Sequence, residues 1–188
     1  MDVNLKDYDN NWYRPGAGVL KRTLWYVTNA LIFDAWWFPF SGVKCTVLRR
    51  FGARVGRGVV IKPRVNIKYP WNLVAEDNVW LGEGVWIDNL APVRIGSDVC
   101  ISQGALLLTG NHDYRDPKFA LVLGEIQIEA GAWIGARAVV CPGVHIARGV
   151  VVTVNSVLTA AGEEGGIYQG NPARRVRGRW TAGADQPS

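Results

Sequence analysis

Aliphatic side chains recur every six residues along most of this chain. The recurring positions are Val55, Ile61, Ile67, Ala75, Leu81, Ile87, Ile95, Ile101, Leu107, Ile128, Ile134, Val140, Ile146, Val152 and Leu158. A second small or β-branched residue stands four places after most of them, as at Val59 and Ala105. A period of six does not fit the turn of an α-helix, because successive positions would rotate around its axis. A hexapeptide repeat is instead typical of a β-helix.

The repeat slips only after every third position. Two residues beyond the usual six separate Ile67 from Ala75, and fifteen separate Leu107 from Ile128. A prism with one hexad on each of three faces, and insertions confined to one corner, has this property. We therefore expect an all-β fold over residues 55–160, a triangular parallel β-helix of about five coils stacked about 4.8 Å apart. Glycines that follow a repeat position are expected at corners that need φ > 0.

The segments on either side of the prism lack the repeat. Residues 1–54 are expected to contain one helix, over residues 19–33, ended by the region of Pro39. Because the terminal coils of a solenoid need covering, this N-terminal segment is predicted to cap the prism. Residues 161–188 are expected to form a short C-terminal extension that is disordered over residues 181–188.

Aromatic residues give the N-terminal segment a second interpretation. Trp25, Trp36 and Trp37 stand near Lys21 and Arg22, a combination typical of helices that lie on a membrane surface. Peripheral contact with a membrane, or with a partner protein, therefore stays open beside the capping role.

Composition places the chain among single-domain globular proteins. Of its 188 residues, 48% are hydrophobic, enough for one core, and no apolar run is long enough to span a bilayer. The first residues are too acidic and polar for a secretory signal. We expect a cytoplasmic protein, with the inner face of the membrane as a second location. The net charge of +5 favours acidic ligands only weakly, and no nucleic-acid partner is expected.

The largest interruption, residues 108–127, contains one of only two histidines. Long excursions from a regular scaffold are usually functional, and His112 stands in this one. Histidine is the side chain best suited to proton transfer at neutral pH, which makes His112 a candidate general base. A lone loop histidine is nevertheless more often incidental than catalytic. The other one, His145, falls inside a regular hexad and is expected to face outward.

Motifs across residues 4–177 resemble those of one enzyme group. The segments are Tyr8-Asp9-Asn10, Trp12-Tyr13-Arg14-Pro15-Gly16, Phe38-Pro39-Phe40-Ser41-Gly42, Val65-Asn66-Ile67-Lys68-Tyr69-Pro70-Trp71, Trp86-Ile87-Asp88-Asn89-Leu90, Ile101-Ser102-Gln103-Gly104, Thr109-Gly110-Asn111-His112-Asp113-Tyr114 and Gly170-Asn171-Pro172-Ala173-Arg174. With the hexads they are similar to the hexapeptide-repeat acyltransferases, and within these to exopolysaccharide O-acetyltransferases of the colanic-acid-biosynthesis type. The resemblance implies a left-handed coil, since the spacing itself carries no handedness. It also implies transfer of acetyl from acetyl-CoA to a sugar hydroxyl, with no metal.

The resemblance assigns roles to particular residues. It implies that His112 removes the proton of the acceptor hydroxyl as this attacks the thioester directly. The acceptor-binding candidates are Asp88, Asn89, Asn111, Tyr114 and Trp133. Acetyl-CoA is implied to lie between the subunits of a homotrimer, and its binding candidates are Ala136, Val154, Thr159, Arg174 and Arg177.

Other readings of these residues stay open. Arginine suits phosphate recognition, but Arg174 and Arg177 could equally belong to a solvated basic tail. Asp88 and Asn89 could form a polar turn before Pro92. The tryptophans that precede repeat positions are expected to point out of the coil, at a subunit interface or in the active cleft. They are Trp80, Trp86 and Trp133.

One segment departs from the family pattern, and other functions have to be weighed. Relatives carry Thr-Lys-Asp after the last coil, whereas this chain has Thr159-Ala160-Ala161, which removes a lysine near the CoA phosphates. A γ-type carbonic anhydrase needs three histidine ligands, and the chain has two histidines in all. A non-catalytic scaffold and an acyltransferase for a non-sugar small molecule remain the alternatives.

Overall fold

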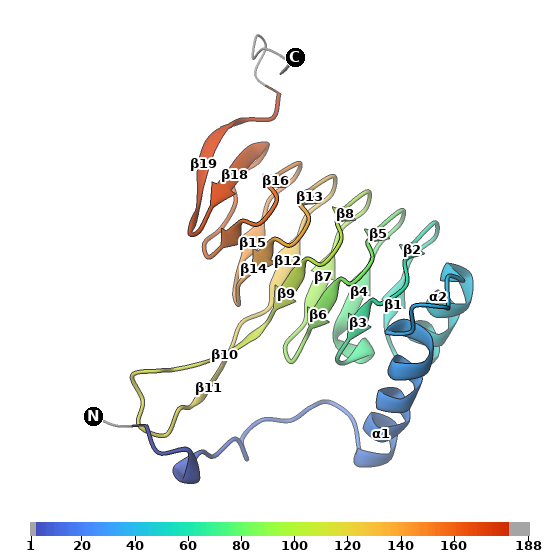
Figure 1. Cartoon of the computed structure of the whole chain (residues 1–188), viewed down its shortest axis with the longest axis vertical. Helices are drawn as coiled ribbons and strands as arrows, with labels where there is room; N and C mark the ends of the chain where they lie inside the picture. The colour runs from blue at the N-terminus through green and yellow to red at the C-terminus, as the bar shows by residue number, and fades with distance from the viewer. Residues whose placement is uncertain (1–2, 181–188) are drawn as a thin grey trace.

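The computed structural model describes residues 3–180, which form a stack of short strands with helices at one end (Figure 1). Most strands belong to three sheets that are the faces of a prism. The first face holds β1 (Arg54–Val55), β4 (Leu73–Ala75), β7 (Val93–Ile95), β12 (Ile126–Ile128) and β15 (His145–Ile146). The second holds β2 (Val60–Ile61), β5 (Trp80–Leu81), β8 (Cys100–Ile101), β13 (Trp133–Ile134), β16 (Val151–Val152), β18 (Gly166–Gly170) and β19 (Ala173–Gly178). The third holds β3 (Asn66–Ile67), β6 (Trp86–Asp88), β9 (Leu106–Leu108), β14 (Val139–Val140) and β17 (Val157–Leu158).

Parallel register carries the six-residue repeat from coil to coil. On the first face Val55 pairs with Ala75, Ala75 with Ile95, and Ile95 with Ile128. From Ile61 to Leu158 the repeat positions are at most 3% exposed, and together they form the core. The insertions all fall between the third and the first face. The prediction of a parallel β-helix with insertions at one corner is therefore confirmed.

The stack is slightly longer than predicted. Beyond β16, the strand β18 adds a parallel neighbour in which Ile167 pairs with Val151, and Gly162 forms a bridge with Ile146. The last strand, β19, folds back antiparallel on β18. A sixth, incomplete coil thus follows the five predicted ones. It was missed because the residues after Leu158 lose the six-residue spacing.

The glycines after repeat positions have a different role from the predicted one. A Cβ on Gly82 would lie 2.8 Å from the backbone nitrogen of Gln103 in the next coil. Positive φ occurs two places later instead, as at Gly84 with a φ of 69°. Glycine therefore follows the repeat position because stacked coils approach closely there, and the left-handed residue comes later in the turn.

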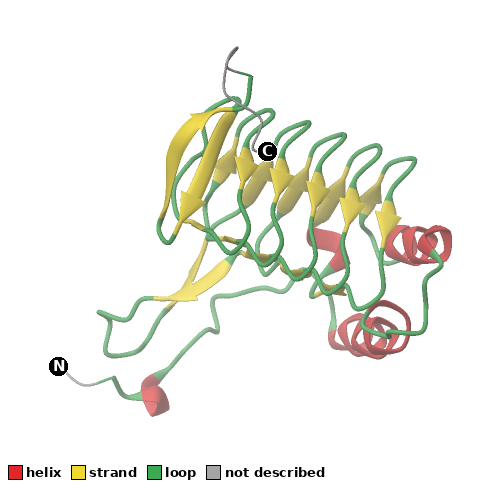
Figure 2. Cartoon of the chain, turned by 45° about the horizontal axis from the view of Figure 1, so that its top comes forward, coloured by secondary structure: helices red, strands yellow, loops and turns green. Residues whose placement is uncertain are grey.

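Helices close the N-terminal end of the stack (Figure 2). The helix α1 (Val19–Thr28) continues into the π-helical turn η2 (Asn29–Phe33), so the helix predicted over residues 19–33 is confirmed, with its end at Phe33. A second helix, α2 (Ser41–Arg50), was not predicted. Two short 3-10 turns, η1 (Leu5–Asp7) and η3 (Pro70–Asn72), lie in the N-terminal arm and in the first insertion.

Side chains of these helices pair with the open edge of the first coil. Trp25, which is 2% exposed, donates from its Nε1 to the Ile67 carbonyl at 2.8 Å. The Ser41 hydroxyl donates to the Ile61 carbonyl at 3.2 Å and accepts from the Ile61 amide at 3.0 Å. An uncovered edge strand presents unpaired backbone groups. The helices therefore act as a cap that both buries the core and completes the edge.

Lys44 brings a charge into the interface between cap and coil. Its side chain is fully buried, and its Nζ donates to the Lys62 carbonyl at 2.8 Å. The ammonium also lies 5.8 Å from the centre of the Phe33 ring. Burial lowers the pKa of Lys44 to about 8, because apolar surroundings disfavour the charged form.

Candidate active site

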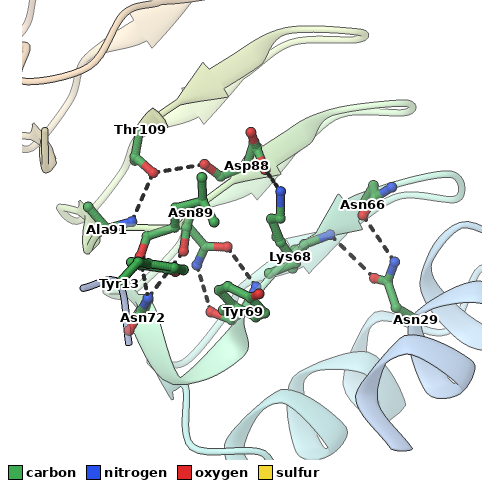
Figure 3. Close-up of polar contacts among 12 residues, drawn as sticks. Tyr13, Asn29, Asn66, Lys68, Tyr69, Asn72, Asp88, Asn89, Ala91 and Thr109 are labelled. Atoms are coloured by element: carbon green, nitrogen blue, oxygen red, sulfur yellow. Dashed lines mark hydrogen bonds and ion pairs between the residues drawn. The ribbon is translucent and has the colours of Figure 1, made fainter. Parts of the chain in front are cut away.

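The largest insertion forms a hairpin that projects from the prism. Its strands β10 (Gly110–His112) and β11 (Leu121–Leu123) pair antiparallel and extend away from the stack (Figure 1). At the base, the buried Thr109 hydroxyl donates to the Asp88 carbonyl at 2.8 Å and accepts from the Ala91 amide at 3.0 Å (Figure 3). These bonds anchor the hairpin in the preceding coil.

One nitrogen of His112 is held by the turn of the hairpin. Nδ1 lies 2.8 Å from the carbonyl oxygen of Phe119, and because a carbonyl can only accept, Nδ1 carries the proton. In the neutral ring, Nε2 then holds the lone pair of a base. The ring stacks on Phe119 with 4.3 Å between centroids and meets the edge of Tyr8 at 5.5 Å. Its orientation is therefore set from both sides.

His112 lines a cavity of about 520 Å³. The other walls come from the N-terminal arm, from α1 and from the insertions of the first two coils. The lining residues are Tyr8, Asn10, Asn11, Tyr13, Arg14, Pro15, Arg22, Lys68, Tyr69, Leu90, His112 and Leu121. The arm is tied to the hairpin by the Asn4 amide, which donates to the Pro117 carbonyl at 2.9 Å. The arm was expected to belong to the cap over residues 1–54, and no place in the active site was predicted for it. Its signal was the Tyr8-Asp9-Asn10 motif, which matches the family outside the repeat.

A second cavity of about 510 Å³ continues along α1. Arg22, Lys68 and Tyr69 line both cavities. Asp88 lines the second, where its Oδ1 lies 2.9 Å from Lys68 Nζ (Figure 3). The Nε of Arg22 is buried and has no hydrogen-bond partner among the described residues. This corner thus holds an ion pair and an arginine whose buried Nε is unpaired among the described residues, beside the histidine cavity.

Tyr13 and Asn89 stabilise the same corner. The Tyr13 hydroxyl donates to the Leu90 carbonyl at 2.9 Å, and burial raises the pKa of this phenol, with Tyr69 and Asp88 adding to the effect. Asn89 is fully buried, and its amide accepts from the Tyr69 N–H at 2.8 Å and donates to the Tyr69 carbonyl at 2.7 Å. Asn89 lines neither cavity, so the structure gives it a bridging place inside the fold.

Two other acceptor candidates lie on the hairpin but outside the cavities. Asn111 accepts from the backbone N–H of His112 at 2.8 Å through its Oδ1. Tyr114 is 73% exposed and contacts Arg115. Neither side chain lines the space in front of His112.

The cofactor candidates of the late coils lie at a different corner. Ala136 and Val154 stand between the second and third faces of successive coils, where the Asn155 amide donates to the Ala136 carbonyl at 2.9 Å. They form a column along the prism, and the exposed Thr159 follows β17. Trp133 projects from the second face, 48% exposed, and donates from Nε1 to the Ser102 hydroxyl at 2.9 Å. None of these candidates lines the cavities near His112, so a single chain does not bring the two sets together.

A bulge places two C-terminal arginines on one face of the last hairpin. Arg174 pairs with Gln169 and Arg177 with Ile167, which leaves Val176 as an extra residue near a register shift. Residues paired across an antiparallel ladder share a face, and the extra residue restores the alternation. Both arginines are exposed, and neither has a carboxylate partner within residues 3–180.

Known proteins are similar to the chain over most of its length. WcaF of Escherichia coli (strain K12), named as an acetyltransferase of colanic acid biosynthesis, is 36% identical over 166 residues, which are 87% of this chain and 90% of WcaF. The chain belongs to the hexapeptide-repeat acetyltransferases of the colanic-acid type. The family resemblance seen in the motifs is thereby confirmed. Nodulation protein L of Rhizobium leguminosarum bv. viciae is 35% identical over 131 residues, or 68% of each chain. No family model matches.

Solved structures of hexapeptide-repeat acetyltransferases share the fold. VCA0836 from Vibrio cholerae O1 biovar eltor, in complex with acetyl coenzyme A, has a TM-score of 0.77 at 22% identity, over 88% of this chain and 92% of that one. A galactoside acetyltransferase in complex with coenzyme A has a TM-score of 0.75 at 20% identity, over 90% and 89%. At these identities the likeness concerns the fold alone.

Residues 3–180 contain neither a metal-binding cluster nor a membrane-spanning helix. No group of three His, Cys, Asp or Glu side chains there is arranged to hold a metal ion. No helix in the same range is long and apolar enough to cross a membrane.

Proposed function

We propose that this acetyltransferase transfers the acetyl group of acetyl-CoA to a hydroxyl of a sugar, in the cytoplasm, during synthesis of an exopolysaccharide or another surface glycan. The observation that supports this best is the tautomer of His112, which frees Nε2 as a base beside a cavity of about 520 Å³. That volume suits a small-molecule site. The name of WcaF supports the choice of a glycan acceptor.

His112 acts as the general base in this proposal. Nε2 takes the proton of the acceptor hydroxyl while its oxygen attacks the thioester carbonyl. The C–O bond forms, the C–S bond breaks, and the departing CoA sulfur receives the proton. The Phe119 carbonyl holds Nδ1–H and stabilises the imidazolium that forms in between. General base catalysis of this kind contributes about 10²–10⁴-fold, and holding hydroxyl and thioester together contributes further.

The acceptor occupies the cavities beside His112. The Asp88 carboxylate can accept from a sugar hydroxyl while it keeps its ion pair with Lys68. Arg22, which lines both cavities, and the arm residue Asn10 can supply donors to the same sugar. Asn89, Asn111 and Tyr114 line neither cavity and stay outside the proposed set.

Acetyl-CoA lies along the column of Ala136 and Val154, with its phosphates toward Arg174 and Arg177. Because this column and His112 lie at different corners, a homotrimer completes the site when the hairpin of one subunit reaches the late coils of its neighbour. The exposed tryptophans of the second and third faces are available for that contact. They are Trp80, Trp86 and Trp133, and Trp133 then stands beside the acceptor.

Acceptor-dependent release of CoA tests the proposal. Purified protein is incubated with acetyl-CoA and a panel of mono- and oligosaccharides, the free thiol is measured, and products are identified by NMR. We expect O-acetylated sugar from the native chain and a loss of about 10²–10⁴-fold with His112→Ala. Calorimetry shows whether the variant still binds CoA, which separates lost chemistry from lost binding. Undiminished turnover by the variant would contradict the role of His112 as general base. Failure of the native chain to bind acetyl-CoA would favour a non-catalytic scaffold.

A further inference from the structure

The outer side of α1 and η2 carries an apolar stripe that stays exposed among the described residues, 3–180. Leu20, Leu24, Val27 and Leu31 are 83%, 57%, 47% and 59% exposed. The spacing of Leu20, Leu24 and Val27 keeps them on one side of α1, which has 3.6 residues per turn, and Leu31 follows in the π-helical turn η2. Trp25, on the other side, is buried against the coil. The cap helix is thus apolar on two sides, and we call the exposed one the outer stripe.

Aromatic side chains are also exposed in the segment that follows the helix. Trp36, Trp37 and Phe40 are 77%, 58% and 62% exposed. They lie in the connection between η2 and α2. Monomeric proteins rarely expose so many large apolar residues together. Aliphatic residues flanked by tryptophan are typical of helices placed at a membrane–water interface.

The charge of the cap favours an anionic lipid surface as the occupant. The cap residues 19–54 contain six basic residues, of which Lys44 is buried, and one acidic residue, Asp34. Two of the basic ones, Arg50 and Arg54, are exposed and have no carboxylate partner within the described part of the chain. Basic side chains near such a helix add electrostatic attraction to anionic headgroups.

A second copy of the chain fits this surface less well. Pairing two caps would bring two basic sets together, which like-charge repulsion opposes. The helix α1 also lies at the N-terminal end of the stack (Figure 1), whereas the exposed Trp80 and Trp133 lie on a face of the prism. The molecule therefore has separate apolar surfaces at its end and along its side.

We propose that the outer stripe and the aromatic residues after it dock the protein on an anionic membrane surface, with α1 lying in the plane of the interface. Together α1 and η2 span residues 19–33, which is too short to cross a bilayer. Val19 and Tyr26 of α1 also line the second cavity. Docking through α1 holds the mouth of that cavity next to the lipid headgroups.

Flotation with vesicles tests the docking without any enzyme substrate. The full chain is mixed with vesicles of phosphatidylcholine alone or with phosphatidylglycerol added. We expect binding to the anionic vesicles, weakened by added salt. The triple variant Leu20→Asn, Leu24→Asn, Leu31→Asn should lower the apparent affinity about tenfold or more, since all three side chains are exposed and their change leaves the core intact. Val176→Asn, an exposed aliphatic at the other end of the stack, is the matched control and should bind like the native chain.

The oligomeric state decides between lipid and a second copy. Light scattering should give the same subunit number for the native chain and the triple variant, and circular dichroism the same spectrum. The proposal would be overturned if the native chain did not float with either kind of vesicle. So would a triple variant that floats as well as the native chain. Loss of subunit association in the variant would assign the stripe to an interface between copies instead.

Discussion

Two histidines stand at the same corner of the prism, and only one has left the coil. After β9 the chain departs into the hairpin that carries His112, whereas after β14 it turns directly into β15, which begins with His145. The Nε2 of His145 lies 2.8 Å from the Glu129 carboxylate of the neighbouring coil. His112 instead offers its Nδ1 to a carbonyl and keeps Nε2 unpaired among the described residues. The coil holds a side chain rigidly but leaves it no room for a substrate, and the insertion supplies that room.

The largest expected difference between the corners is in catalysis. His112→Ala should lower kcat by about 10²–10⁴-fold, because it removes the proposed base. His145→Ala should leave kcat within about twofold, since His145 belongs to an exposed ion pair away from the cavities. Steady-state kinetics of CoA release measure both. Equal losses in the two variants would mean that the corners do not differ in chemistry.

The second difference concerns how the hairpin rejoins the stack. A Cβ on Gly124 would lie 2.4 Å from the backbone nitrogen of Gly143, at the very corner that precedes His145. Gly124→Ala should therefore lower the free energy of unfolding by about 1–3 kcal/mol, because stacked backbones cannot easily part. At the other root of the hairpin, a Cβ on Gly110 would clash with the end of the Leu90 side chain and make an ordinary contact with Leu123.

Gly110→Ala is therefore the matched control, and it should cost less than about 1 kcal/mol because a leucine side chain can rotate away. Urea unfolding of both variants makes the comparison. If the two cost the same, the return of the hairpin is not fixed by contact with the next coil.

The regular coils could be predicted from the sequence, whereas the contacts around the hairpin could not. The coils were predictable because every interior position must be aliphatic, so residues such as Ile128 and Ile146 can be recognised from their spacing. The helix α2 was not, since its buried residues include Lys44 and Cys45 and show no apolar period. The tautomer of His112 depends on Phe119, whose φ of 54° turns its carbonyl back across the hairpin. The N-terminal arm reaches His112 only through tertiary contacts such as that of Tyr8. The local sequence pattern predicts neither the tautomer of His112 nor its contact with the arm.

The third prediction concerns Lys44, whose replacement should change the stability of the stack without changing catalysis at the hairpin. The folded pKa of Lys44 is about 8 against an ordinary 10.5, so at pH 7 the buried charge costs about 3 kcal/mol. Lys44→Met removes that cost but also the hydrogen bond to Lys62, worth about 1 kcal/mol. The variant should gain about 2 kcal/mol at pH 7 and keep its kcat.

The pH dependence gives this prediction its sign. Between pH 8 and 10.5 the folded native chain binds fewer protons at Lys44 than the unfolded chain does, so its stability should rise with pH across that window. Lys44→Met should lack the rise. Urea unfolding at several pH values measures it. A variant less stable than the native chain at pH 7 would show that the ring of Phe33 and the Lys62 carbonyl compensate the charge fully.

The smallest expected effect is at the regular corner itself. Glu129 accepts from the Arg148 amide at 3.0 Å and pairs with His145, yet both side chains of the pair are more than one third exposed. Such pairs contribute at most about 1 kcal/mol. Glu129→Gln keeps an oxygen for the Arg148 amide, so it should change the free energy of unfolding by less than about 1 kcal/mol, a difference that shrinks as salt is added. A loss above about 2 kcal/mol would make His145 an anchor of the coil. In that case the contacts of both histidines would matter to the protein. A position outside the six-residue repeat would then no longer be enough to single out His112 as the catalytic residue.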